Sequence, residues 1–408
     1  MKVINECDIE FQNNVQEFYV KQSPNTGSAI GYINEKGKKL DDENNTAKLP
    51  LAFTKYIQKG VTFSNRFIVS PMCTYSCQDG FMTDWHIAHY GGLALQCPGA
   101  IVVEATAVQK EGRISVLCCG LWSDAHITAH KRVTSIIKQQ GVVAGIQLAH
   151  SGRKGSGLPP WISRSSVASE EIGGWPNSVY APSAIPFDDE SALPLELTKS
   201  QIQECIDAFA LAAIRADKAG YDFIEIHAAH GYLISEFLSP NVNKRTDEYG
   251  GTLENRFRFL VEIIQKIKSV WPQNKPIWVR ISCTEWVQGG WDINDSVSLS
   301  RVLKHLGIDL IDCSSGGINS EQQIHAKPLF QVPFAEKIKK DVGIATGAVG
   351  IITTSANVEN ILQKGQCDLV FAARQFLLEP SFVKRSAVEL GVDLKWNFQY
   401  ERGKRNRL

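Results

Sequence analysis

Short runs of consecutive apolar residues recur along this chain, and helix-length segments separate them. Runs that are apolar at every position suit strands buried on both faces of a parallel sheet, because helices cover both faces of such a sheet. Eight repeats of strand and helix favour an α/β fold with a closed (β/α)8 TIM barrel over an open doubly wound sheet. The predicted strands are residues 67–70, 100–105, 142–148, 223–226, 277–281, 310–313, 343–346 and 369–373.

Two of the segments between these runs carry distinct helix signals. Thr198, followed three residues later by Gln201, predicts a capping box at the start of the helix after the third run. Phe257 belongs to a second pattern of apolar residues at helical spacing, and this helix is expected to end before Pro272.

The composition divides the chain at about residue 50. Residues 34–48 are rich in Lys, Asn, Asp and Glu without a periodic apolar pattern, so residues 1–50 are predicted to be a partly ordered N-terminal extension. Within it, residues 9–19 could dock on the main domain. Residues 51–408 are predicted to form one barrel domain. Residues 151–197, rich in Gly, Pro and Ser, are too long for an ordinary connection, and we expect them to cap the C-terminal mouth of the barrel.

Charge and hydropathy exclude several classes of partner. The 43 basic and 43 acidic residues give no electrostatic case for nucleic acid or an anionic membrane as a partner. No apolar run approaches the roughly 20 residues that cross a bilayer, and the first residues lack the apolar stretch of a secretion signal. Ten cysteines without a CxxC pair then fit reduced thiols, so we expect a cytoplasmic protein.

The ends of the last two predicted strands indicate a phosphate site. In many TIM barrels, backbone N–H groups and a cation converge in the loops after strands seven and eight. Gly347 and Ala348 would let the backbone approach a phosphate, and Arg374 would pair with it bidentately. Arg280, on the fifth strand, points into the mouth and needs a buried anionic or carbonyl partner. Together these residues predict a phosphorylated cofactor.

The end of the fourth strand carries two histidines and a tyrosine. His227 and His230 could donate hydrogen bonds to one carbonyl oxygen, which would make a conjugated β-carbon electrophilic. Tyr232 keeps its proton at neutral pH and could protonate the neighbouring carbon. Taken alone, the histidines also fit a metal-dependent barrel hydrolase that uses His227, His230 and His150. Against it, the first strand lacks histidine and no carboxylate is placed as a bridging ligand.

Longer motifs lie at the strand ends and in the loops after them. They are Ser70-Pro-Met-Cys-Thr-Tyr, Gln147-Leu-Ala-His-Ser-Gly-Arg, Glu225-Ile-His-Ala-Ala-His-Gly-Tyr-Leu, Phe237-Leu-Ser-Pro, Arg245-Thr-Asp-Glu-Tyr-Gly-Gly and Glu254-Asn-Arg. In this order they resemble the old yellow enzyme family of NADH:flavin oxidoreductases. Cys73 and the ending Gln399-Tyr-Glu-Arg-Gly resemble the subgroup related to thermostable bacterial ene-reductases. The resemblance covers about residues 51–403.

The resemblance implies that the barrel binds FMN. Gln147 would bond the pyrimidine edge of the flavin, Arg280 would lie near N1 and O2, and Arg374 would hold the phosphate. Cys73 would lie near the flavin and tune its redox potential. Ala373 is a departure, because the family usually has glycine before the phosphate-binding arginine, and phosphate affinity is the property it affects. The full implied FMN set is Ser70, Pro71, Met72, Cys73, Ala105, Gln147, Arg280, Gly347, Ala373 and Arg374.

The resemblance also implies a ping-pong reaction in which NAD(P)H reduces the flavin and an enone or enal then reoxidises it. His227 and His230 would bind the substrate carbonyl, Tyr75 would line the pocket and Tyr232 would donate the proton. Arg402 resembles an arginine that reaches into a neighbouring subunit's site, which implies a homodimer or homotetramer. Flavin-dependent dehydrogenation or demethylation on the same scaffold stays open. A flavin protein without turnover is disfavoured, since both histidines and Tyr232 are present.

Overall fold

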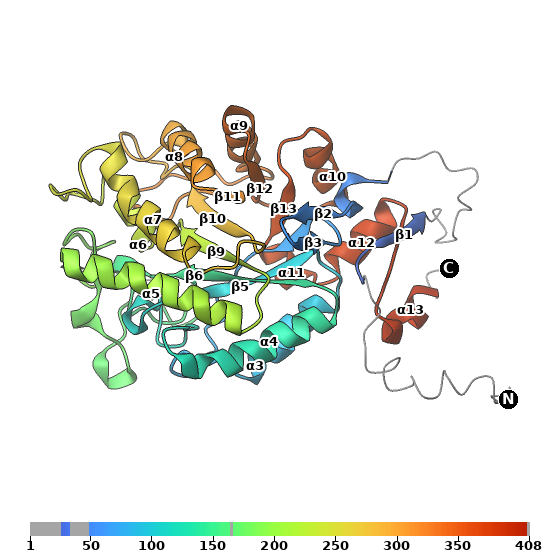
Figure 1. Cartoon of the computed structure of the whole chain (residues 1–408), viewed down its shortest axis with the longest axis horizontal. Coiled ribbons are helices and arrows are strands. Elements are labelled where there is room, and N and C mark those ends of the chain that lie inside the picture. The colour runs from blue at the N-terminus through green and yellow to red at the C-terminus, as the bar shows by residue number, and fades with distance from the viewer. Residues whose placement is uncertain (1–25, 33–48, 164–165, 406–408) are drawn as a thin grey trace.

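A closed barrel of eight parallel strands is the centre of the computed structural model, which describes residues 26–32, 49–163 and 166–405 (Figure 1). Each barrel strand hydrogen-bonds to the barrel strand that follows it in sequence, and the last barrel strand pairs with the first. This confirms the predicted (β/α)8 barrel. The strands are β4 (Phe67–Val69), β5 (Ala100–Ala107), β6 (Val143–Ala149), β9 (Phe223–Ala228), β10 (Ile277–Ser282), β11 (Leu310–Ser314), β12 (Ala345–Ala348) and β13 (Leu369–Ala372).

Helices follow the strands and surround them (Figure 1). In α7, the predicted apolar positions Phe257, Leu260, Ile264 and Ile267 are all buried, and the helix ends before Pro272 as expected. The helices that follow the strands are α3 (Asp84–Ala94), α4 (Ile127–Gln139), α5 (Lys199–Lys218), α6 (Leu233–Leu238), α7 (Leu253–Lys268), α8 (Ile293–His305), α9 (Val332–Val342), α10 (Ser355–Gln363), α11 (Arg374–Leu378) and α12 (Phe382–Glu389).

The predicted capping box at the start of α5 is present. The Thr198 hydroxyl accepts a hydrogen bond from the backbone N–H of Gln201 at 3.3 Å, and the Gln201 side chain accepts one from the N–H of Thr198 at 2.9 Å. The Thr198→Ala substitution is therefore expected to lower the free energy of unfolding by about 1 kcal/mol. Chemical denaturation checks this, with Gln203→Ala on the exposed face of α5 as the control that changes stability by less than about 0.5 kcal/mol. Equal effects of the two substitutions would contradict the cap.

The seventh strand is β12 at Ala345–Ala348, two residues later than predicted. Gly343, the first residue of the predicted run, instead ends α9 in the left-handed conformation with φ 68°, and its N–H bonds to the carbonyl of Lys339. A glycine there serves the helix end, because it adopts positive φ without steric cost. The eighth strand likewise ends at Ala372, since Ala373 is the N-cap residue of α11.

A two-stranded hairpin closes the end of the barrel at which the strands begin. It consists of β2 (Tyr56–Gln58) and β3 (Val61–Phe63). Phe63 is fully buried and stacks on Trp278 of β10 with ring centroids 5.7 Å apart. Aromatic and aliphatic side chains therefore fill the barrel interior at this end.

The two termini of the described chain meet beside the barrel. Strand β1 (Ala29–Tyr32) pairs antiparallel with β14 (Val392–Leu394), and α13 (Glu401–Arg405) follows. The boundary at residue 50 stays a prediction, and the predicted segments 9–19 and 34–48 lie outside the described residues. No helix in the described part of the chain is long and apolar enough to span a membrane.

Candidate active site

The segment 151–197, predicted to cap the mouth, lies between β6 and α5. It contains the short strands β7 (Tyr180–Ala181) and β8 (Leu195–Glu196), which pair with each other. Residues from its first and last parts, together with residues that follow β4, β5 and β9, line one of two cavities at the C-terminal ends of the strands. We call this one the cap cavity and the other the arginine cavity.

The arginine cavity contains two of the predicted FMN ligands with a positive charge. Arg280 is 6% exposed at the end of β10, and Arg374 is exposed at the start of α11. The cavity has a volume of about 470 Å³, a size typical of sites for small ligands. Its lining residues beyond the predicted ones are Ser314, Phe330, Gln331, Val349, Gly350, Ile351, Ile352, Thr353, Phe371, Ala372, Gln375 and Leu378.

Unsatisfied polar atoms support a ligand in this region. Within the described ranges, the buried hydroxyl of Ser70 has no hydrogen-bond partner, and the Nε of Arg280 forms no hydrogen bond although it lies 3.2 Å from a carboxylate oxygen of Asp312. Buried donors and acceptors are nearly always satisfied, so these two groups, which follow or lie on β4 and β10 at opposite sides of the barrel, fit a polar ligand that spans the mouth. A ligand with an anionic group and several carbonyl and N–H groups, such as FMN, would satisfy both.

Gly347 does not line the arginine cavity. A Cβ atom at this position would collide with the ring of Phe371, so packing inside the barrel accounts for the glycine. The glycine that does line the cavity is Gly350, with φ 126°, three residues later. Because the seventh strand was predicted two residues too early, Gly347 rather than Gly350 was expected to follow it. Ala373 has φ −110° and ψ −90°, so its φ lies outside the left-handed range that favours glycine.

The other predicted FMN residues lie at the ends of adjacent strands. Ser70 follows β4, and its N–H bonds to the carbonyl of Ala372 in β13. Ala105 in β5 and Gln147 in β6 are both buried. Pro71 and Met72 are half-buried in the loop after β4. Because β13, β4, β5 and β6 are consecutive in the barrel, these residues form one continuous rim.

Cys73 is half-buried at the same rim and forms a hydrogen bond with the thiol of Cys118. This hydrogen bond and burial raise the pKa of the Cys73 thiol, and the nearby Glu104 carboxylate adds to the shift. The thiol is therefore protonated at neutral pH. The nine cysteines in the described ranges form no disulfide with one another.

His227 and His230 face each other at the end of β9, with ring centroids 5.1 Å apart. The Nδ1 of His227 accepts the N–H of Ala229 at 3.3 Å, so a neutral ring carries its proton on Nε2. The Nε2 of His230 lies 2.7 Å from the hydroxyl of Ser314. The ring of Tyr232 lies 5.0 Å from that of His227, which brings the three predicted residues together.

Burial and two nearby cations set the protonation of the histidines. Burial lowers the pKa of both His227 and His230 well below the usual range, and the charges of Arg280 and Lys154 add to the effect. Neutral rings can donate one hydrogen bond each to a ligand oxygen. Burial also raises the pKa of the Tyr232 phenol, which keeps its proton available.

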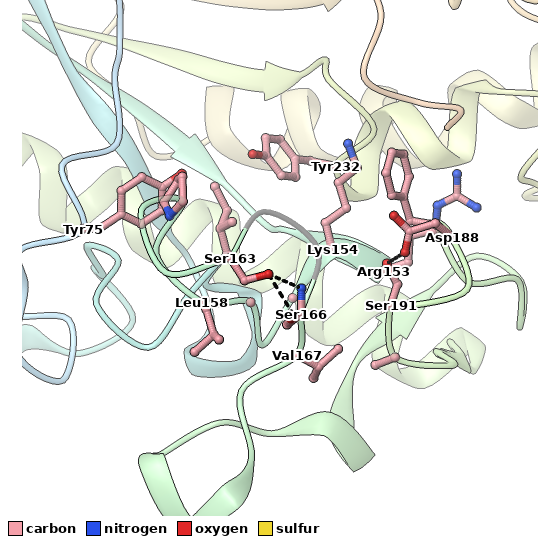
Figure 2. Close-up of a pocket in the computed structure, with 16 residues that line it drawn as sticks. Tyr75, Arg153, Lys154, Leu158, Ser163, Ser166, Val167, Asp188, Ser191 and Tyr232 are labelled. Carbon is pink, nitrogen blue, oxygen red and sulfur yellow. Dashed lines mark hydrogen bonds between the residues drawn. The ribbon is translucent and has the colours of Figure 1, made fainter. Parts of the chain in front are cut away.

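The cap cavity contains the other predicted substrate residue. Figure 2 shows Tyr75, Lys154 and Tyr232 lining it, with Lys154 beside Tyr232. Tyr75 has a strained φ of 51°, and its ring packs edge-on against Trp161 with centroids 5.8 Å apart. The volume of this cavity is about 300 Å³, the lower end of ligand-site sizes.

Lys154 is a site residue that the sequence analysis missed. Its Nζ donates hydrogen bonds to the carbonyls of His230, at 2.9 Å, and Gly317. Burial lowers the pKa of its ammonium group to about 7, and the adjacent Arg153 charge contributes. The signal in the sequence was its place directly after the motif that runs from Gln147 to Arg153, but nothing in that motif showed which way the Lys154 side chain points.

Two of the predicted residues, Arg402 and His150, do not line this site. Arg402 is exposed on α13 and lines neither cavity, so its role in a neighbouring subunit stays a prediction. His150, proposed as a third metal ligand, is buried with its pKa lowered to about 4 and its Nδ1 accepts the N–H of Gly152. Among the residues with described positions, no three His, Cys, Asp or Glu side chains gather as a metal site. The geometry thus gives no support to the hydrolase alternative.

Comparisons with known proteins are consistent with a flavin site. Residues 55–392 match the model of the NADH:flavin oxidoreductase / NADH oxidase family. The NADPH dehydrogenase of Bacillus velezensis is 47% identical over 352 residues, which cover 86% of this chain and 98% of that protein. The NADPH dehydrogenase of Bacillus subtilis is 46% identical over 353 residues, again 86% of this chain and 98% of that protein.

Solved structures support the fold. Morphinone reductase is 24% identical with a TM-score of 0.70, and the match covers 86% of this chain and 92% of that chain. An old yellow enzyme homologue from Zymomonas mobilis is 24% identical with a TM-score of 0.69, covering 88% of this chain and 99% of that chain. At these identities the structural likeness concerns the barrel rather than the reaction.

Proposed function

Because this chain belongs to the NADH:flavin oxidoreductase / NADH oxidase family, the old yellow enzyme family, we propose that it reduces the activated C=C bond of α,β-unsaturated carbonyl compounds. The protein is an FMN-dependent oxidoreductase with NAD(P)H as reductant. What we add is the acceptor, an enone or enal, and the residues that act on it.

The observation that carries the proposal is the arrangement of His227, His230 and Tyr232. The two imidazoles lie 5.1 Å apart and are neutral, so both can donate to one carbonyl oxygen. The phenol next to His227 holds a proton. Two donors for one oxygen and a separate acid for a carbon are what the reduction of a conjugated carbonyl compound requires.

FMN, when bound, would supply the hydride chemistry between NAD(P)H and the β-carbon of the acceptor. The Nε2–H of His227 and a ring nitrogen of His230 bind the acceptor oxygen and stabilise the negative charge that develops there. Tyr232 protonates the α-carbon. Tyr75 and the cap cavity orient the carbon skeleton and exclude water.

The proposed FMN ligands occupy the rest of the mouth. Arg374 would hold the phosphate in the arginine cavity, and Arg280 and Gln147 would bind the pyrimidine edge. The other contacts would come from Ser70, Pro71, Met72, Cys73, Ala105 and Ala373. In a homodimer or homotetramer, Arg402 would complete the substrate site of the neighbouring subunit, as its exposure on α13 permits.

The visible spectrum of the purified protein tests the proposal. We expect a flavin spectrum that bleaches when NADPH is added without oxygen and returns when cyclohexenone follows. Cyclohexanone, which lacks the conjugated bond, is the matched control and should leave the flavin bleached. Bleaching without recovery on cyclohexenone would contradict the enone acceptor while keeping the flavin.

A further inference from the structure

Four polar side chains cross the interior of the barrel below its mouth. They are Gln147, Glu225, Arg280 and Asp312, from the neighbouring strands β6, β9, β10 and β11, and none is more than 6% exposed. The strand register pairs Gln147 with Glu225 and Arg280 with Asp312. The Gln147 amide donates to Glu225 at 2.8 Å, and the Nε of Arg280 lies 3.2 Å from a carboxylate oxygen of Asp312.

The two carboxyl groups of this layer differ in charge. Burial, together with the charge of Asp312, raises the pKa of Glu225 to about 8. Burial raises the pKa of Asp312 only to about 6, because Arg280 opposes the shift. At pH 7, therefore, Glu225 is mostly neutral and Asp312 is mostly ionised.

The carboxylate of Asp312 is poorly satisfied. Neither of its oxygens accepts a hydrogen bond from any residue whose position the structure describes, and its register neighbour on the other side is Gly347, which has no side chain. A buried carboxylate without hydrogen bonds is costly, and packing alone would favour an apolar residue. Among the described residues, the charged group in contact with it is Arg280, which lines the arginine cavity.

We propose that Asp312 is a positioning residue that limits how strongly Arg280 stabilises the reduced form of FMN. The inference rests on the proposed placement of the FMN pyrimidine edge at Gln147 and Arg280. Reduction adds electrons to the flavin, and a cation at that edge favours the added negative charge. A carboxylate 3.2 Å from the same cation offsets its field, so FMN stays a stronger hydride donor than Arg280 alone would allow.

The test is the Asp312→Asn substitution in the FMN-loaded protein at pH 7. Asparagine has nearly the same shape and keeps an oxygen toward Arg280, but it removes the charge. We expect the substitution to strengthen the binding of reduced FMN relative to oxidised FMN by about tenfold. For a two-electron couple this raises the midpoint potential by about 30 mV. Anaerobic equilibration with reference dyes measures the potential without any substrate.

Glu225→Gln is the matched control in the same layer. It replaces a mostly neutral carboxyl group by a neutral amide, so the potential should stay within error of the wild type. An effect as large as that of Asp312→Asn would overturn the inference, and so would an unchanged or lower potential in Asp312→Asn. A purely structural role would lower the thermal stability of the variant without moving the potential.

Two further variants keep the outcomes distinguishable. Asp312→Ser removes the charge with a smaller side chain and should also raise the potential. If neither Asp312 variant binds FMN, Asp312 is a structural ion-pair partner and the inference fails.

Arg280→Gln should lower the potential. If Arg280→Gln leaves the potential unchanged, the placement of FMN at Arg280 is wrong. If Arg280→Gln lowers the potential but Asp312→Asn does not change it, only the role of Asp312 is rejected.

Discussion

Replacing both His227 and His230 by alanine is expected to slow the reoxidation of reduced FMN by cyclohexenone by about 10⁴-fold. Removal of one preorganised hydrogen-bond donor to a developing oxyanion costs about 10²–10³-fold, and both donors are lost here. Their ring centroids lie 5.1 Å apart, and each ring is buried at the end of β9. Stopped-flow absorbance of the flavin follows this half-reaction directly.

Molecular oxygen is the internal control for the histidine variant. It accepts electrons from reduced flavin without a carbonyl group, so its reaction should be nearly unchanged. In the wild type, the cyclohexenone step should not weaken as the pH rises through the range where an ordinary histidine loses its proton. The reason is that the pKa of both rings is already lowered well below that range. Equal losses with oxygen and cyclohexenone would contradict a role in carbonyl binding.

The Arg374→Ala substitution is expected to weaken FMN binding by about 10²–10⁴-fold. A hydrogen bond to a charged group contributes about 1.5–3 kcal/mol, and a bidentate contact to phosphate has two of them. The arginine cavity contains Arg374 together with Arg280, and Arg374 forms no ion pair with another described residue. Quenching of FMN fluorescence during titration of the flavin-free protein measures the change.

Riboflavin separates the phosphate contact from general damage to the site. It lacks the phosphate, so its affinity should be nearly the same in the wild type and in Arg374→Ala. Arg132→Ala is the control variant for loss of surface charge. It removes an exposed arginine that pairs with Asp84 and does not line the arginine cavity. An equal loss of affinity for riboflavin and FMN would mean that Arg374 does not hold the phosphate.

Much of the fold was predictable because barrel strands are buried on both faces. The runs around β5, β6 and β9 are apolar at nearly every position, and they were placed within a few residues of their observed bounds. The run at β12 was misplaced by two residues, because Gly343 and Ile344 continue the apolar pattern although Gly343 ends α9. A pattern of residue types does not distinguish a glycine that ends a helix from one that begins a strand.

The candidate site was only partly predictable. Its motifs placed His227, His230 and Tyr232 at one strand end, where the structure brings their rings within contact. Lys154 was missed, because its partners are the carbonyls of His230 and Gly317, groups that every residue has. The sequence predicted that Gly347 lets the backbone approach a phosphate. In the structure a side chain at this position would instead collide with the ring of Phe371 on the next strand.

The sequence by itself determined the eight-strand alternation, the capping box of α5 and the residues that reach the barrel mouth, because period, capping and motif order are local properties of the chain. Only the tertiary structure decided the charge state of the residues there. The pairing of Arg280 with Asp312 and of Gln147 with Glu225 joins residues 32 and 78 positions apart across strand register. Burial and the field of such distant neighbours set protonation, and both depend on how the whole barrel closes.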